Sequence, residues 1–109
     1  MKAKSPKIDA GSAAECLAAL GSAPRLEIFR LLVRSGREGL TVGEVQRHVA
    51  IPGSTLSHHL DALARTGLIV QERQGREIIC KPDYPRMRGV IAFLTDQCCV
   101  GVAKASDAA

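Results

Sequence analysis

Four cysteines carry the most distinctive chemistry of this 109-residue chain, at Cys16, Cys80 and the adjacent pair Cys98-Cys99. Thiolates are soft ligands that suit soft, thiophilic species. The spacing of the cysteines fits neither a zinc ribbon nor a disulfide scaffold, because no CxxC knuckle is present. The N-terminal segment, residues 1–7, is basic but lacks the apolar stretch of a signal peptide. We therefore expect a cytoplasmic protein with reduced thiols.

The composition indicates a single helical domain rather than an enzyme or a membrane protein. Hydrophobic residues make up 46% of the chain, but it has no Trp, one Tyr and two Phe, so the core must be aliphatic. The chain contains no run of 18 apolar residues, so no membrane-spanning helix is expected. Paired carboxylates and nucleophile–base spacings are absent as well, which argues against catalysis. The net charge of +4 suits a polyanionic partner.

Apolar spacing predicts two helices in the first third of the chain. The first begins at Ser12, a candidate N-cap, and ends at Gly21. Pro24 opens the second, which is apolar around much of its circumference and should be the central core helix. The stripe expected on the first helix is Ala13, Leu17 and Leu20, with Cys16 beside it.

Two short helices joined by a tight turn are expected in the middle of the chain. Thr41 and Glu44 have the spacing of a capping box, which opens a helix packed through Val42, Val45 and Val49. Ala50-Ile51-Pro52-Gly53 supplies the turn, and the second helix should run from Ser54 to Thr66. This arrangement is typical of a helix-turn-helix.

The second of these helices has one apolar and one polar face. Leu56, Leu60 and Leu63 recur at i, i+4 and i+7, so they should hold the helix to the core. Hydroxyls and imidazoles occupy the opposite face and can bond phosphates and base edges in a DNA major groove. The candidate DNA contacts on this helix are Ser54, Thr55, Ser57, His58, His59 and Arg65.

A hairpin and a final helix follow. Gly67 should stop the preceding helix, and β-prone runs at 68–73 and 76–80 flank Gln74-Gly75, a hairpin signal. The tip carries Arg73 and Arg76 and no hydrophobic residue, so we interpret it as a DNA-contacting wing. The last helix is predicted from about Pro85 to Val102, with an apolar stripe of Met87, Val90, Ile91, Leu94 and Cys98.

These expectations amount to a mainly α fold with a β-hairpin wing. One winged helix-turn-helix domain is predicted over residues 12–103, between a mobile tail at 1–11 and a frayed tail at 104–109.

Several segments resemble the ArsR/SmtB family of arsenical repressors. The resemblance covers about residues 13–100 and implies a winged-helix homodimer, joined through its first and last helices, that represses transcription until a ligand binds. No cofactor is implied for DNA binding, and operator DNA is the implied partner. The matching segments are Leu20–Leu26, Leu40–Val45, Ser54–Leu60, Leu63–Ile69 and the wing Arg73–Arg76.

The chain departs from two ligand sites of that family. Thr41, Gly43 and Gln46 stand where the best-known arsenic site has its thiols. The family's zinc site draws on the last helix, whereas all three histidines of this chain lie in or beside the helix-turn-helix. The pair Cys98-Cys99 is similar to members with arsenic thiols near the end of the last helix.

We therefore expect a repressor of an arsenic resistance operon, released when arsenite, methylarsenite or antimonite binds Cys98 and Cys99. On a helix, Cys98 would face the core stripe and Cys99 its edge. Cys80 or Cys16, from either subunit, is the candidate third thiol, and without one the pair suits methylarsenite. Taken alone, Cys16 and Cys80 fit a packing role better, and His59 fits a core or capping role as well as a DNA contact.

Two alternatives remain open at this point. The cysteines could form a switch operated by oxidation, by persulfidation or by another thiophilic metal, and an oxidative switch would require a bond to Cys16 or Cys80. A winged helix can also bind a protein instead of DNA, and that interaction would be insensitive to salt.

Overall fold

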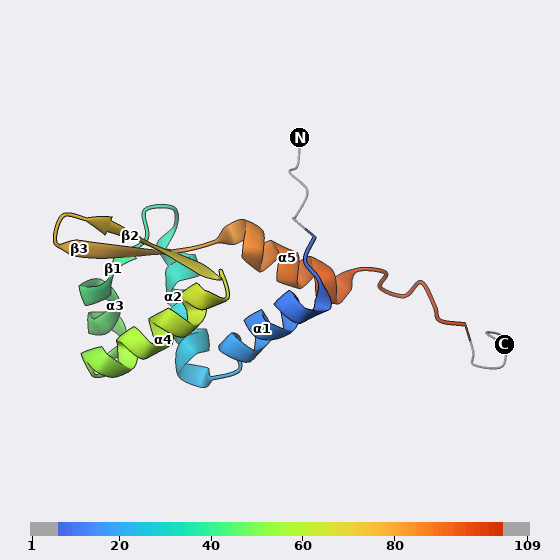
Figure 1. Cartoon of the computed structure of the whole chain (residues 1–109), viewed down its shortest axis with the longest axis horizontal. Coiled ribbons are helices and arrows are strands. Elements are labelled where there is room, and N and C mark those ends of the chain that lie inside the picture. The colour runs from blue at the N-terminus through green and yellow to red at the C-terminus, as the bar shows by residue number, and fades with distance from the viewer. Residues whose placement is uncertain (1–6, 104–109) are drawn as a thin grey trace.

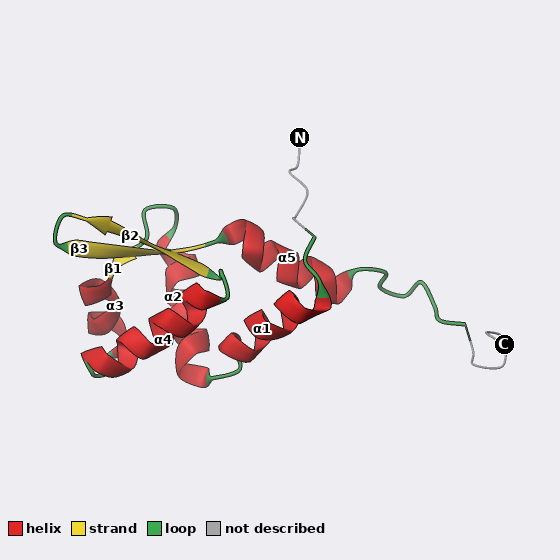
Figure 2. Ribbon diagram, viewed as in Figure 1, coloured by secondary structure: helices red, strands yellow, loops and turns green. Residues whose placement is uncertain are grey.

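The structure is a computed structural model that describes residues 7–103. Five helices and a three-stranded sheet make up this part of the chain, with the hairpin at one end and the first and last helices at the other (Figures 1 and 2). The elements in order are α1 Ala10–Leu20, α2 Ala23–Ser35, β1 Leu40–Thr41, α3 Val42–Val49, α4 Gly53–Arg65, β2 Ile69–Gln74, β3 Glu77–Pro82 and α5 Tyr84–Thr95.

α1 begins earlier than the sequence predicts. The Asp9 side chain accepts a hydrogen bond from the backbone N–H of Ser12 at 2.7 Å, so Asp9, not Ser12, is the N-cap. Ile8 also packs against the core. The carboxylate of Asp9 is a stronger acceptor for these N–H groups than a hydroxyl, which explains the earlier start. The other residues of the predicted tail, 1–6, lie outside the described part of the chain.

The buried face of α1 differs from the predicted stripe. Leu17 is 40% exposed, whereas Cys16 is fully buried. Small side chains fill this face where α1 meets α2, α4 and α5, because they let the helices approach closely. The buried residues of α1 are Ala13, Cys16 and Ala19.

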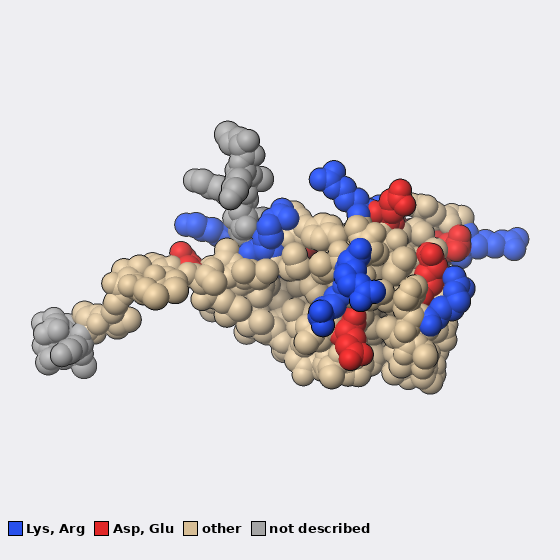
Figure 3. All heavy atoms as spheres, turned by 180° about the vertical axis from the view of Figure 1, so that it is seen from behind, with Lys and Arg blue, Asp and Glu red and all other residues tan. Residues whose placement is uncertain are grey.

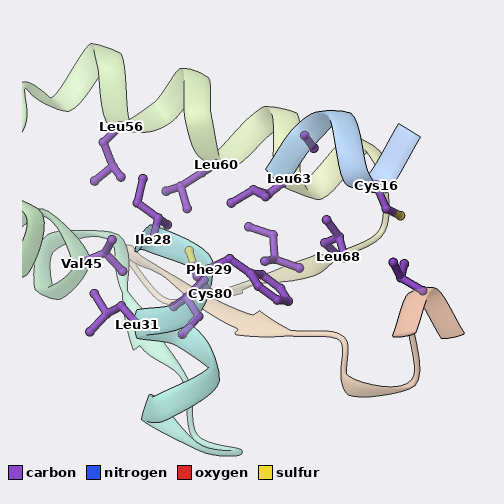
Figure 4. Packing of buried hydrophobic residues seen from close by; sticks show 14 residues of the cluster. Cys16, Ile28, Phe29, Leu31, Val45, Leu56, Leu60, Leu63, Leu68 and Cys80 are labelled. Atoms are coloured by element: carbon purple, nitrogen blue, oxygen red, sulfur yellow. The ribbon is translucent and has the colours of Figure 1, made fainter. Parts of the chain in front are cut away.

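The core is mainly aliphatic, as predicted, with Phe29 as a buried aromatic side chain, and α2 and α4 bury four residues each. Pro24 lies in the first turn of α2. In Figure 4 the side chains of α2 and α4 point toward one another, with Cys80 beside the α2 side chains and Leu68 on the side toward α5. Leu26 at the start of α2 is 43% exposed, so this helix is buried on one broad face only. Its buried residues are Ile28, Phe29, Leu31 and Leu32.

The hairpin is extended by a strand that the sequence analysis did not predict. The sheet order is β1-β3-β2, antiparallel throughout, with Leu40 opposite Cys80. Two residues are too few to give a periodic signal. The hairpin turn is Gly75-Arg76, because Gln74 pairs with Glu77, so the predicted turn at Gln74-Gly75 is wrong by one residue.

α5 is shorter than predicted. It ends at Thr95, whereas the apolar spacing predicted a helix to about Val102. The Thr95 hydroxyl donates to the carbonyl of Ile91 at 3.0 Å, and Gln97 and Cys99 adopt positive φ angles of 60° and 64°, which no α-helix contains. Thr95 and Asp96 have low helix propensity, and the residues that follow them in the described part of the chain make no core contact that would stabilise a longer helix. The predicted frayed tail at 104–109 lies outside the described residues.

The apolar stripe of α5 divides into two parts. Met87 and Val90 pack against the core, as expected. Ile91 and Leu94 are 53% and 61% exposed, and Cys98 is exposed too. α5 lies against α1 (Figure 1), so these side chains and Leu17 of α1 belong to the same end of the molecule.

Candidate DNA interface and thiol site

α4 is held to the core through the three predicted leucines. Leu56, Leu60 and Leu63 are between 0% and 1% exposed and point from α4 into the core (Figure 4). The predicted anchoring role of these residues is therefore confirmed. The opposite face of α4 carries the exposed side chains Ser54, Thr55, Ser57, His58 and Arg65.

The start of α4 has no side-chain cap. Pro52 occupies the N-cap position and cannot supply an acceptor, so no side chain satisfies the first backbone N–H groups. The turn before it is fixed by Gln46, whose amide donates to the carbonyl of Ile51 at 3.2 Å, and by Ala50 in the left-handed conformation. A helix start with free N–H groups can bind a phosphate oxygen.

His59 occupies a different environment from His58. It is half-buried, and its Nδ1 accepts a hydrogen bond from Nε of Arg25 at 3.1 Å. Burial, followed by the charges of Arg25 and His58, lowers the pKa of His59 below its ordinary value, which favours the neutral ring that this bond requires. The geometry supports the alternative in which His59 joins α2 to α4, whereas His58 is exposed.

The end of α4 is tied to both α1 and α5. The carbonyl of Thr66 accepts hydrogen bonds from Sγ of Cys16 at 3.4 Å and from Nε of Arg86 at 3.1 Å. Gly67 follows at φ 79°, as expected of a helix stop. These bonds fix the C-terminus of α4 against the end of the molecule that carries α1 and α5.

The wing presents its two arginines to solvent. Arg73 and Arg76 are both exposed near the hairpin tip. Glu72 and Lys81 form an ion pair across β2 and β3 at 3.1 Å. A hollow of about 350 Å³ separates the wing from α4, and it is lined in part by Ser57, Asp61, Gln71 and Arg76.

Sequence analysis missed Asp61 and Gln71 as residues of this surface. Asp61 follows Ser54 by seven positions and Ser57 by four, so helical periodicity could have found it. No comparable signal identifies Gln71. Figure 3 views the molecule from behind Figure 1, and on that face basic and acidic side chains are interspersed, with no single basic patch.

The cysteines fall into two groups. Cys98 and Cys99 are exposed beyond the end of α5, and their Sγ atoms lie 3.3 Å apart. The prediction that Cys98 faces the core is wrong, because the helix ends before it. Cys16 and Cys80 are fully buried. Burial raises the pKa of the Cys80 thiol, opposed by a hydrogen bond from Gln71, and so disfavours its thiolate.

The structure brings no third thiol to the pair within one subunit. In residues 7–103 no group of three or more His, Cys, Asp or Glu side chains is arranged to hold a metal ion. The Cys98-Cys99 segment projects from the α1–α5 end, away from α4 and the wing (Figure 1). An intrachain bond to Cys16 or Cys80 would require the core to open.

A helix-turn-helix domain model matches residues 20–72, and no curated protein matches significantly. An ArsR-like transcriptional regulator from Rhodococcus sp. RHA1 shares 25% identity and a TM-score of 0.68, covering 77% of this chain and 76% of that one. A protein named as a possible transcriptional regulator for arsenical resistance has 25% identity, a TM-score of 0.65 and coverages of 73% and 80%. HlyU from Vibrio cholerae has 25% identity, a TM-score of 0.63 and coverages of 82% and 94%.

The domain model covers the helix-turn-helix and ends within β2, the first strand of the wing. The fold and the family are those of DNA-binding transcriptional regulators and not of enzymes. Within residues 7–103, none of the helices has the length and hydrophobicity needed to span a bilayer. The chain therefore carries a helix-turn-helix domain in a winged fold that is similar to the folds of ArsR-family transcriptional regulators.

Proposed function

We propose that the protein is an operator-binding repressor that releases DNA when a trivalent arsenical binds Cys98 and Cys99. The observation that supports this site most directly is the exposed pair of thiols, whose Sγ atoms lie 3.3 Å apart. Thiolates are the preferred ligands of thiophilic metalloids. Two thiols match a methylarsenical, which has two exchangeable positions, and arsenite or antimonite would need a third.

The DNA contacts in this proposal are Ser54, Thr55, Ser57 and His58 at the major groove, with Arg65, Arg73 and Arg76 on phosphates. His59 has the role of holding α4 against Arg25. The exposure of the polar face of α4 and the uncapped start of the helix support this assignment. Replacing both Arg73 and Arg76 with Ala should weaken DNA binding at all sequences. The log-log salt slope should fall by about 1 for each phosphate that is no longer neutralised.

The proposal includes a homodimer formed through α1 and α5. Leu17, Ile91 and Leu94 expose apolar surface on these two helices, which are in contact with each other. A ligand near the end of α5 can then favour a dimer geometry in which the two α4 helices no longer fit successive major grooves. The bonds from Cys16 and Arg86 to Thr66 supply a connection from α1 and α5 to α4.

Two double variants separate the thiol pair from the buried cysteines. Cys98→Ser with Cys99→Ser should bind the DNA upstream of its own gene as the wild type does, but without release by methylarsenite, measured by fluorescence anisotropy. Cys16→Ala with Cys80→Ala removes the other thiols and should keep the release by methylarsenite. Release by arsenite from this second variant would mean that Cys16 and Cys80 supply no third ligand.

Two results would contradict the assignment. Release of the Cys98→Ser, Cys99→Ser variant by methylarsenite would exclude the pair as the sensor. Equal release of the wild type by zinc or cadmium would replace the arsenical with a metal ion as the inducer.

The exposure of both thiols also favours a second candidate function, an oxidative or persulfide switch. Because Cys16 and Cys80 are buried, the oxidised form would join Cys98 or Cys99 to a second subunit. Mass spectrometry of the oxidised protein tests this function, since it requires an interchain disulfide or a persulfide on Cys98 or Cys99 that accompanies loss of DNA binding.

A further inference from the structure

α4 carries one acidic side chain, Asp61, on the same exposed face as its hydroxyls and imidazole. Ser54, Ser57, His58 and Asp61 stand at i, i+3, i+4 and i+7, so they form a single row along the helix. The recognition helix of a homeodomain contacts the major groove from four positions with this same spacing. Asp61 therefore lies within reach of a groove that the rest of the row enters.

A carboxylate in this place is unfavourable for contact with a DNA backbone. Phosphates repel it, and a surface selected only for general DNA affinity would carry a neutral or basic side chain here. Among residues 7–103, the ion pair within 4.0 Å joins Lys81 to Glu72, so Asp61 forms no ion pair at that distance. Its oxygens remain available to a donor on the DNA.

The neighbours of Asp61 include donors and cations, and the Glu77 carboxylate lies across the hollow on the wing. On the wing side it lines the hollow shared with Gln71 and Arg76. On the other side it lines a second hollow with His58 and Arg65. These donors and cations can bind phosphates and acceptor atoms of bases, so Asp61 is the acceptor-only position of α4.

We propose that Asp61 determines sequence specificity by accepting a hydrogen bond from the N4 amino group of a cytosine in the major groove. This inference rests on the proposed DNA contact of α4. Cytosine presents a donor at this edge, whereas guanine and thymine present acceptors that a carboxylate repels. Adenine presents its donor beside the N7 acceptor, which disfavours a carboxylate. The preference for cytosine should be roughly 5- to 150-fold at one base pair of each half-site.

Selection from a randomised pool of duplex DNA tests the proposal with the full chain. The wild type should enrich a cytosine at one position of each half-site. Asp61→Ala should lose the preference at that position alone, and Asp61→Asn should shift it toward adenine, which an amide contacts through two hydrogen bonds. Both variants should bind a non-selected duplex more tightly than the wild type does, because a repulsive charge has been removed.

Glu27→Gln is the matched control, since Glu27 is an exposed carboxylate on α2. It should keep the base preferences of the wild type. Circular dichroism establishes that each variant is folded.

Unchanged base preferences in both Asp61 variants would overturn this inference while leaving the proposed DNA binding intact. Failure of the wild type to enrich any sequence would overturn the proposed function together with the inference.

Discussion

Two reciprocal hydrogen bonds fix the start of α3. Oγ1 of Thr41 accepts from the backbone N–H of Glu44 at 3.0 Å, and the Glu44 carboxylate accepts from the backbone N–H of Thr41 at 2.9 Å. Thr41 also pairs with Ile79 in the sheet. One residue therefore joins the first helix of the helix-turn-helix to the wing, and the four-residue spacing of this motif is why the sequence predicted it correctly.

Thr41→Ala should lower the free energy of unfolding by about 1 kcal/mol, because the backbone N–H of Glu44 loses its acceptor. Urea denaturation followed by circular dichroism measures the change. Thr55→Ala is the control, since Thr55 is exposed on α4, and it should change stability by less than about 0.5 kcal/mol. An equal loss in the two variants would argue against a specific capping role.

Glu44 makes the same motif sensitive to acid. The hydrogen bond from the Thr41 backbone N–H, chiefly, lowers the pKa of the Glu44 carboxyl below its ordinary value of 4.5. Its stabilising contribution is therefore complete above pH 4.5 and is lost as the pH falls through the lower pKa of the folded state. Glu44→Gln keeps the acceptor but cannot titrate.

The difference in unfolding free energy between wild type and Glu44→Gln should therefore shrink as the pH falls from neutrality to about 3. Urea titrations across this range measure it. A difference that does not depend on pH would mean that the carboxylate charge contributes nothing to the cap.

Among the helices and strands, the sequence predicted correctly those that have a strong local signal. Periodic leucines gave the buried face of α4, and Pro24 gave the start of α2. β1 was missed because it forms only where Gly39 lets the chain approach Cys80 of β3. The end of α5 was missed because the apolar residues at its end, such as Leu94, are exposed and do not extend the helix by packing. That error also placed Cys98 wrongly.

Gly39 shows how closely β1 approaches β3. It has φ +72°, and a Cβ here would overlap the carbonyl oxygen of Cys80. Gly36, in the same loop, has φ +81° but open space around it. Gly36→Ala should therefore lose about 1 to 3 kcal/mol of stability, and this loss comes from backbone strain alone, because φ 81° with ψ −165° is a conformation that essentially only glycine adopts. Gly39→Ala should lose at least about 2 kcal/mol more, because β1 must move from β3.

Urea denaturation of the two glycine variants measures this difference. If they lose the same stability, the close approach of β1 to β3 would not be a stabilising feature of the fold.

On the scale of the whole molecule, the proposed DNA contacts and the thiols lie at opposite ends. α4 and the wing form one end, and the Cys98-Cys99 segment extends from the other (Figure 1). A signal from the thiols must therefore pass through α1 and α5, whose exposed apolar side chains we assign to the dimer. The state of the dimer then determines whether two α4 helices fit one operator.

Leu94→Glu tests this dependence, because it buries a charge in the proposed dimer interface. Sedimentation velocity should show a monomer, whereas the control Val70→Glu, an equally drastic change at an exposed site on β2, should remain dimeric. A monomer engages one half-site at a time, so its affinity for a two-half-site operator should fall about 10²- to 10⁴-fold. Its affinity for a single half-site should be unchanged. A dimeric Leu94→Glu variant with normal operator binding would exclude α5 from the interface.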